Sequence, residues 1–250
     1  MQDCLAVNRA YLRTHPERSL TEAQQHQLRQ NLNRRLAGEP LAYILGYTEF
    51  YGLRLQVSPA VLIPRADTEL LVDLALKYIE PSQSAQVLDL GTGSGAIAIA
   101  IATERPLAHV TAVDYSQDAL SVAQENVCAH RLSVKLLHSD WFSALPQQTF
   151  DMIVSNPPYI VENDPHLQQT SLPFEPISAL TSGTNGLDDI AHIIEQAPHW
   201  LSAQGWLLIE HGYHQGQVVR SLFEKHGFQS IRTHQDYGQQ DRVTMGQLGR

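Results

Sequence analysis

The chain has 250 residues, of which 43% are hydrophobic, and its 17 basic and 26 acidic side chains give a formal net charge of −9. This length and apolar content suit one sizeable core with a small appendage, and they exclude a disordered chain. The acidic balance disfavours a nucleic-acid-binding surface, which needs clustered lysine and arginine. The two cysteines, Cys4 and Cys128, are far apart and provide neither a metal-ligand spacing nor a disulfide framework.

The chain carries no sign of export or membrane insertion. Its first residues are polar and lack the apolar run of a signal peptide. The longest apolar stretch, at 96–102, is too short to span a bilayer. We therefore expect a cytoplasmic protein without membrane contact.

The first 46 residues predict a small helical domain. A helix should begin after Thr21 and run to Leu36, with leucines at four-residue spacing, and it should stop at Gly38. Residues 47–66 predict a connecting β-hairpin, because apolar residues nearly alternate from Phe50 to Val57. The remaining residues, 67–250, should form the main domain.

The main domain alternates between short apolar strands and helical segments. We expect strands at 87–90, 109–113, 134–138, 152–154 and 206–209, and helices at 94–104, 116–128, 187–200 and 217–225. Two final strands, 228–233 and 243–245, are separated only by a loop and should form an antiparallel hairpin at one edge. This order predicts an α/β fold: a doubly wound, mostly parallel seven-stranded sheet, Rossmann-like, with helices on both faces.

A glycine-rich loop follows the first of these strands. The segment Gly91-Thr92-Gly93-Ser94-Gly95 lies where open α/β sheets bind ligands, and glycines let backbone N–H groups approach a ligand closely. The spacing also satisfies the dinucleotide pattern, and a plain structural turn remains an alternative. Asp89, just before the loop, could orient a ligand's amino group or bond the loop backbone.

Two further positions bear on the ligand of this loop. Asp114 ends the second strand, where a carboxylate can accept hydrogen bonds from both ribose hydroxyls of an adenosine-containing cofactor or simply cap the next helix. Asp140 and Trp141 follow the third strand, which places a carboxylate and an indole where an adenine would lie. Together these features favour S-adenosylmethionine over NAD as the cofactor.

The segment Asn156-Pro157-Pro158-Tyr159 directly follows the fourth strand. Two consecutive prolines cannot continue a ladder, and they form a rigid corner that directs the Asn156 side chain and the neighbouring carbonyl into one crevice. Two acceptor oxygens can hold a planar –NH2 by its two hydrogens and direct its lone pair at an electrophile. Tyr159 can stack on a planar amide or base. We therefore expect Asn156, Pro157 and Tyr159 to be catalytic.

At these motifs the chain resembles the peptide chain release factor glutamine methyltransferases, the PrmC/HemK family of class I methyltransferases. The resemblance runs from about Leu36 to Met245 and is specific because several motifs recur together. They are Glu39-Pro40, Glu49-Phe50, Leu62 to Arg65, Asp67 to Glu69, the glycine loop, Asp114, Ser139 to Phe142, Asn156 to Tyr159, Phe174 to Pro176, Glu210 to Gly212 and Asp241 to Thr244.

The resemblance implies a function for residues 67–250 as an S-adenosylmethionine-dependent methyltransferase domain. Such an enzyme would methylate N5 of the glutamine in the Gly-Gly-Gln motif of release factors 1 and 2, supporting translation termination and releasing S-adenosylhomocysteine. The cofactor would contact Gly91 to Gly95, Asp114, Asp140, Trp141 and Asn156, and Asn156, Pro157, Pro158 and Tyr159 would hold the glutamine amide. No metal is implied.

The chain also departs from the family pattern. Its N-terminal helical domain is shorter than is usual in the family, which uses that domain to dock the release factor. Ala66 stands where the family usually has a second proline. The stretch 184–186 carries no interpretation.

Other functions and sites remain open on the residues alone. An adenine-N6 methyltransferase would use the same clamp on a flipped base, and a non-catalytic binding module or a nicotinamide dehydrogenase would use the glycine loop. His211 and His214 lack the partners of a metal site. Arg65 and Glu69 are spaced to form an ion pair across one helical turn. Glu175 and Glu210 fit either the crevice or the scaffold.

Overall fold

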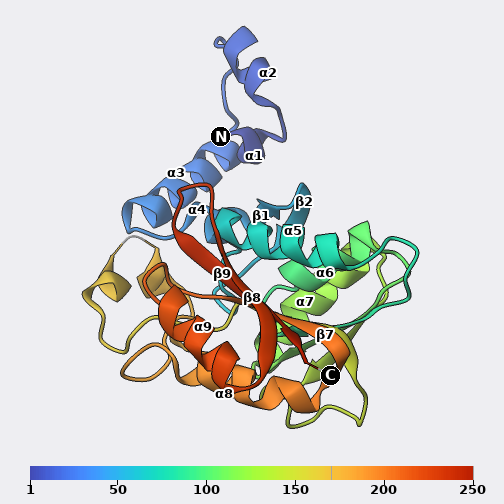
Figure 1. Cartoon of the computed structure of the whole chain (residues 1–250). Coiled ribbons are helices and arrows are strands. Elements are labelled where there is room, and N and C mark those ends of the chain that lie inside the picture. The colour runs from blue at the N-terminus through green and yellow to red at the C-terminus, as the bar shows by residue number, and fades with distance from the viewer. Residues whose placement is uncertain (170, 250) are drawn as a thin grey trace.

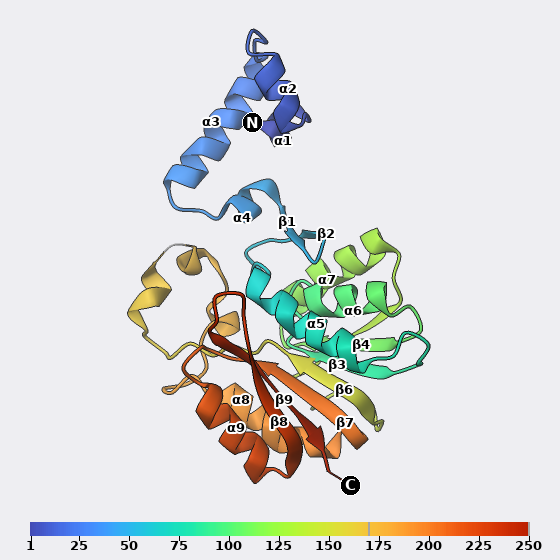
Figure 2. The same ribbon diagram turned by 45° about the horizontal axis from the view of Figure 1, so that its top comes forward.

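The computed structural model describes residues 1–169 and 171–249, and a seven-stranded sheet forms its centre (Figures 1 and 2). The strands are β3 (Gln86–Leu90), β4 (His109–Asp114), β5 (Val134–His138), β6 (Phe150–Ser155), β7 (Leu201–Glu210), β8 (Phe228–Gln235) and β9 (Asp241–Leu248). Their order in the sheet is β5-β4-β3-β6-β7-β9-β8. Strands β3 to β7 pair in parallel, whereas β9 is antiparallel to both β7 and β8. The predicted sheet with an antiparallel edge is confirmed.

Helices cover both faces of this sheet (Figure 2). On one face lie α5 (Glu69–Tyr78), α6 (Ala96–Glu104) and α7 (Gln117–His130), and on the other lie α8 (Asp188–Gln196) and α9 (Gly216–Lys225). The central strands alternate between two apolar cores, because successive side chains of a strand point to opposite faces. One core takes Val87, Met152, Val154 and Leu208, and the other takes Leu88, Ile153, Leu207 and Ile209.

The N-terminal segment projects from the sheet domain as a group of helices (Figure 1). It contains α1 (Gln2–Leu5), α2 (Arg9–Thr14), α3 (Glu22–Leu36) and α4 (Leu41–Leu45), followed by the hairpin of β1 (Tyr47–Phe50) and β2 (Leu53–Gln56). Thr21 and Gln24 form a reciprocal capping box at the start of α3, as the sequence predicted for Thr21. The predicted hairpin is also present.

Several elements differ from the sequence prediction. Helices α1, α2, α4 and α5 were not predicted. The signal for α5 was present but was not used: Glu69, Asp73 and Lys77 recur at four-residue spacing among apolar residues, and Leu71, Val72, Leu74, Ala75 and Leu76 are buried. The predicted helix at 187–200 is shorter, since α8 ends at Gln196 and a 3-10 turn containing Pro198 follows.

The strand order reverses between β3 and β6, and this creates the crevice of the fold. From β3 the chain moves outward through β4 and β5, and it returns to the other side of β3 as β6. Leu90 and Ser155 are register partners at the carboxyl ends of the two strands, and the Ser155 hydroxyl donates to the Leu90 carbonyl at 2.8 Å. The two predicted functional loops therefore begin side by side.

The described residues also include short 3-10 helical turns. They are η1 (Ala66–Thr68), η2 (Pro165–Gln168), η3 (Leu172–Phe174), η4 (Ile177–Ala179) and η5 (Ala197–His199). No helix in the described ranges combines the length and apolarity needed to cross a membrane.

Candidate active site

The glycine loop connects β3 to α6 in a conformation that requires glycine. Gly91, Gly93 and Gly95 have φ angles of 72°, 55° and 85°, in the left-handed region that side-chain-bearing residues rarely adopt. The N–H groups of Gly91 and Thr92 both donate to the carbonyl of Val113, which ties the loop to the end of β4. Thr92 and Ser94 are buried within the loop. The loop is therefore a fixed cradle at the switch point.

Asp114 links this cradle to the next helix. Its Oδ2 accepts from the N–H of Gly93 and its Oδ1 accepts from the N–H of Ser116, each at 2.8 Å. Ser116 in turn caps α7 by accepting from Ala119. Burial raises the pKa of Asp114 above its usual range. Because each carboxylate oxygen can accept a second hydrogen bond, Asp114 holds the loop and remains able to accept from a ligand's hydroxyls.

Asp89 lies beneath the glycine loop and is completely buried. The Thr92 hydroxyl donates to its Oδ2 at 2.6 Å, whereas its Oδ1 has no hydrogen-bond partner among the described residues. Burial raises the pKa of Asp89 to about 7. An unpartnered buried carboxylate oxygen beside a ligand-binding loop is a candidate acceptor for a ligand's ammonium group.

The raised pKa of Asp89 predicts a pH-dependent stability. The unfolded carboxyl has a pKa of about 3.9, so the folded state binds this proton more tightly. The contribution of Asp89 to stability is therefore fully present below pH about 4 and is lost as the pH rises through about 7. We compare the free energies of unfolding of Asp89→Asn and the wild type by urea denaturation at pH 5 and at pH 8. The difference, variant minus wild type, should be larger at pH 8 than at pH 5. An unchanged difference between the two pH values would contradict this expectation.

The indole of Trp141 packs against the glycine loop at Gly91. A Cβ built on Gly91 would lie 3.4 Å from Cζ3 of the indole, and the indole Nε1 donates to Oδ1 of Asp189 at 3.2 Å. Trp141 therefore lies between the glycine loop and the first turn of α8. The neighbouring Asp140 has an exposed side chain, so it is close to the loop in sequence but is not buried against it.

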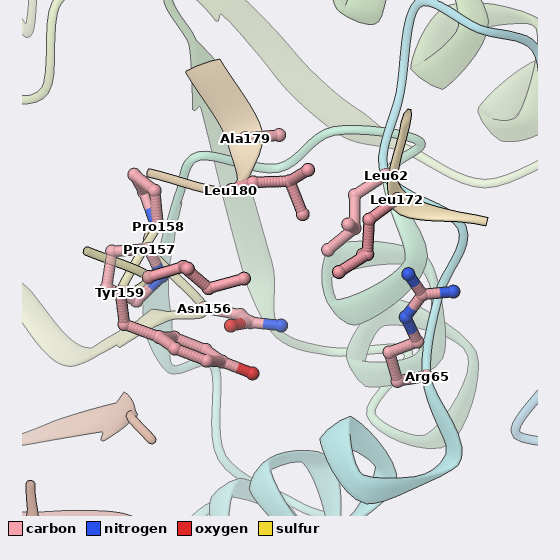
Figure 3. Close-up of a pocket in the computed structure, with 10 residues that line it drawn as sticks. Leu62, Arg65, Asn156, Pro157, Pro158, Tyr159, Leu172, Ala179 and Leu180 are labelled. Carbon is pink, nitrogen blue, oxygen red and sulfur yellow. The ribbon is translucent and has the colours of Figure 1, made fainter. Parts of the chain in front are cut away.

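The Asn-Pro-Pro-Tyr corner lines a small pocket of about 80 Å³. The walls opposite the corner come from three segments that contribute Leu62, Arg65, Leu172, Ala179 and Leu180 (Figure 3). Asn156 donates through Nδ2 to the Thr68 hydroxyl at 3.2 Å. This orientation leaves Asn156 Oδ1 available as an acceptor, as the clamp hypothesis requires. Figure 3 shows the Tyr159 ring directly beside the Asn156 amide.

The backbone of this corner is held by a residue that the sequence analysis missed. Nε2 of the buried Gln215 donates to the carbonyls of Tyr159 at 3.1 Å and Gly186 at 3.0 Å, while its Oε1 accepts from Gly212. One side chain thus connects three loops at the carboxyl end of the sheet. No sequence motif signals this role, because the three loops are distant along the chain.

An ion pair fixes the pocket wall opposite the corner. Arg65 donates to Oε1 of Glu175 at 2.5 Å, and the Glu175 side chain is fully buried. The second oxygen of Glu175 accepts from the N–H of Ile63 at 3.1 Å. The expected pair of Arg65 with Glu69 is wrong: Glu69 instead accepts from the N–H of Tyr51 at 2.8 Å. The tertiary fold provides a nearby buried carboxylate that helical spacing could not reveal.

Removing the Glu175 carboxylate should destabilise the protein. We expect Glu175→Ala to lower the free energy of unfolding by about 1–3 kcal/mol, because the N–H of Ile63 would be left without its partner. Glu175→Gln keeps an acceptor for that N–H and should lose less. Chemical denaturation of the three proteins measures the order, and equal stabilities would contradict it.

The histidines do not form a metal site in the described ranges. Nε2 of His211 lies 2.8 Å from the Thr244 hydroxyl, and its Nδ1 donates to the Gly212 carbonyl at 3.0 Å. Burial lowers the pKa of His211, which favours the neutral ring. No group of three or more His, Cys, Asp or Glu side chains gathers as a ligand set in those ranges.

Comparison with known proteins identifies the family. Residues 66–172 match the model of the methyltransferase small domain, and residues 1–46 match the PrmC N-terminal domain. The chain is 51% identical over 241 residues to the release factor glutamine methyltransferase of Escherichia coli strain K12, covering 95% of this chain and 86% of that protein. The chain belongs to the release factor glutamine methyltransferase family. The Vibrio cholerae member is 51% identical over 247 residues, with 97% of this chain and 85% of that protein covered.

Solved structures agree on the fold of this family member. A methyltransferase from Pyrococcus furiosus superposes with a TM-score of 0.60 at 18% identity, covering 92% of this chain and all of that one. A 16S rRNA methyltransferase of T. thermophilus, in complex with AdoMet and guanosine, also has a TM-score of 0.60, at 22% identity over 81% of this chain and 49% of that one. These similarities establish the class I methyltransferase fold around the two loops.

Proposed function

We propose that this release factor glutamine methyltransferase transfers a methyl group from S-adenosylmethionine to N5 of the glutamine in the Gly-Gly-Gln motif of release factors. One observation carries the proposal. The Asn-Pro-Pro-Tyr corner, with Asn156 Oδ1 left free to accept, begins beside the glycine loop at the point where the strand order reverses. About 50% identity to the E. coli and V. cholerae enzymes of that name supports the substrate.

The residues around the glycine loop fit the proposed cofactor. The positive-φ glycines carry no side chain over the loop, so a ligand can approach its backbone closely. Asp114 keeps accepting capacity for ribose hydroxyls, and Asp89 offers an unpartnered oxygen for an ammonium group. Trp141 forms an apolar wall over the loop. Bound S-adenosylmethionine supplies a methyl group on a positively charged sulfur, which is a strong electrophile. We propose Gly91 to Gly95, Asp114, Trp141 and Asn156 as its contacts, with the exposed Asp140 at the edge.

The Asn-Pro-Pro-Tyr corner would position the glutamine nitrogen that receives the methyl group. Asn156 Oδ1 and the Pro157 carbonyl would accept the two hydrogens of the glutamine –NH2, and Tyr159 and Pro158 would form the sides of the slot. Holding an amide nitrogen in line for displacement can supply about 7–11 kcal/mol of a barrier. The same two acceptors bind more strongly as positive charge builds on the nitrogen, which favours the transition state over the ground state.

Both release factors 1 and 2 are proposed as substrates, with docking through the helical domain of residues 1–46. The match of these residues to the PrmC N-terminal domain supports that division of the chain. We place the reaction in the cytoplasm, where release factors act, and both cysteines are free thiols in the structure.

Mass spectrometry of a purified release factor tests the proposal. After incubation with the protein and S-adenosylmethionine, the Gly-Gly-Gln peptide should gain one methyl group, and it should not when the cofactor is omitted. A release factor whose motif glutamine is replaced by alanine is the substrate control. Methylation of adenine in DNA or RNA in place of the peptide would overturn the proposed substrate in favour of the nucleic-acid alternative.

A further inference from the structure

A buried asparagine on α7 binds two segments that are far from it in the sequence. Asn126 is fully buried, and its Nδ2 donates to the carbonyl of Ser94 in the glycine loop at 2.9 Å. The same Nδ2 donates to the carbonyl of Gln56, the last residue of β2, at 3.0 Å. Its Oδ1 accepts from the N–H of Gln56 at 2.6 Å. One side chain therefore joins the glycine loop to the β1–β2 hairpin.

These three hydrogen bonds determine how the Asn126 amide is oriented. An asparagine side chain offers two N–H donors and one acceptor oxygen. Both donors are used here, one for each backbone carbonyl. In the flipped orientation Oδ1 would face two carbonyl oxygens, and Nδ2 would face the N–H of Gln56. A carboxylate of the same shape could not replace this amide, because it has no donor for the two carbonyls.

On the loop side, Asn126 holds one peptide unit of the glycine loop. The carbonyl of Ser94 and the N–H of Gly95 belong to the same planar unit. The carbonyl accepts from Asn126, and the N–H donates to the carbonyl of Thr92 at 2.9 Å. A Cβ on Gly95 would lie 3.4 Å from Cβ of Ala123, which is three residues before Asn126 and on the same face of the helix. The end of the loop is therefore placed directly against α7.

On the hairpin side, α7 takes the place of a third strand (Figure 2). Gln56 is the register partner of Tyr47 in β1 and turns its N–H and its carbonyl to Asn126. Nε2 of His130, one turn further along α7, lies 2.9 Å from the carbonyl of Arg54 in β2. Residues two apart in an antiparallel strand direct their backbone groups to the same edge. Side chains of one helix thus bind the outer edge of β2.

The hairpin in turn adjoins the N-terminal helices. The N–H of Val57, just after β2, donates at 3.0 Å to the carbonyl of Gly46, the residue that caps the C-terminus of α4. Hydrogen bonds therefore run from the end of α4 through the hairpin to Asn126, and from Asn126 to the glycine loop.

We propose that Asn126 is a positioning residue for cofactor binding, which holds the Ser94–Gly95 peptide against the hairpin and so couples the glycine loop to the segment that carries the N-terminal helices. Asn126 acts through the backbone of the loop. The inference rests on the proposed assignment of this loop to S-adenosylmethionine. Because coupling between two sites is reciprocal, a ligand bound at the loop also stabilises the outer edge of β2.

Hydrogen exchange of the wild-type protein tests this coupling without any substitution. We expect S-adenosylmethionine to slow amide exchange by about 5-fold or more at residues 91–97 and also at residues 53–57. Release of the Gln56 N–H from Asn126 also disturbs the bond to Ser94, so stabilising the loop makes this release less frequent. Protection of 91–97 without 53–57 would overturn the inference alone. Protection of neither segment would overturn the assignment of the loop and the inference with it.

Two substitutions of Asn126 separate its two contacts. Asn126→Ala removes all three hydrogen bonds, whereas Asn126→Asp keeps an acceptor for the N–H of Gln56 and turns an oxygen toward the carbonyl of Ser94. We expect both variants to bind S-adenosylmethionine about 10-fold more weakly or worse in calorimetry, because the released loop must be ordered again on binding. The cofactor should no longer slow exchange at 53–57 in either variant.

His130→Ala is the matched control on the same helix. It removes a contact between α7 and β2 and leaves the bonds of Asn126 in place. Its affinity for S-adenosylmethionine and its protection at 53–57 should equal those of the wild type. Equal affinities in Asn126→Asp and His130→Ala would overturn the inference, and the wild-type exchange result decides it if an Asn126 variant does not fold. A protein that shows these effects but methylates no Gly-Gly-Gln peptide would overturn the proposed function alone.

Discussion

Asn156→Ala is expected to abolish methyl transfer to the release factor while leaving the affinity for S-adenosylmethionine largely intact. The substitution removes the Oδ1 acceptor from the pocket and also the Nδ2 donor to Thr68. Loss of one preorganised group that acts on charge developing in the transition state costs about 100- to 1,000-fold in kcat. Loss of alignment of the accepting nitrogen adds to this cost.

The measurement combines transfer of a labelled methyl group to the release factor with cofactor binding by calorimetry. Asn156→Asp is a useful companion, because it keeps one acceptor oxygen in the pocket but replaces the donor to Thr68 by a carboxylate close to Glu210. We expect it to be nearly as inactive as Asn156→Ala. Full activity in Asn156→Ala would remove the amide-holding role from the clamp.

The sequence predicted the parts of this site that depend on local order. A run such as 206–209 is apolar at every position, which indicates a strand buried on both faces. A glycine loop or a double proline at a strand end constrains the backbone within a few residues. The strand alternation then placed both loops at one edge of the sheet. For this reason the glycine loop and the Asn-Pro-Pro-Tyr segment were predicted to lie side by side, and the pairing of β3 with β6 confirms this.

The supporting residues could not be found in the same way. Thr68, Gln215 and Glu210 make contacts between segments separated by 51 to 88 positions. Thr68 and Glu210 stand in recurring motifs, but the motifs do not show which residues they contact, and Gln215 has no motif of its own. Arg65 shows most directly that sequence spacing alone does not identify a side chain's partner in the fold. Its spacing from Glu69 satisfied a local rule, but the fold brought Glu175 to it from 110 positions away. Local rules predict pairings between neighbours in the sequence, whereas the tertiary fold can bring a partner from a distant segment.

Gly186 shows how such support can be tested at a position that the sequence analysis left without interpretation. Its φ is +71°, and a Cβ there would overlap the carbonyl oxygen of Tyr159 and lie 3.0 Å from Gln215 Nε2. These are the two groups whose hydrogen bond holds the corner. We expect Gly186→Ala to displace the Tyr159 backbone and to lower kcat by at least about 100-fold, since misplacement by 1 Å can cost that much.

Gly52→Ala is the matched control for the backbone strain of this substitution. Gly52 has the same φ of +71°, at the turn of the β1–β2 hairpin, but a Cβ there would meet nothing within 4 Å. Both variants should lose about 1–2 kcal/mol of stability from the left-handed conformation of an alanine, whereas only Gly186→Ala should lose activity. Denaturation and methyl-transfer rates of the two proteins separate the effects. Equal activities would mean that the corner adjusts to the added methyl group, so that the hydrogen bonds from Gln215 stabilise the loops without setting the position of Tyr159.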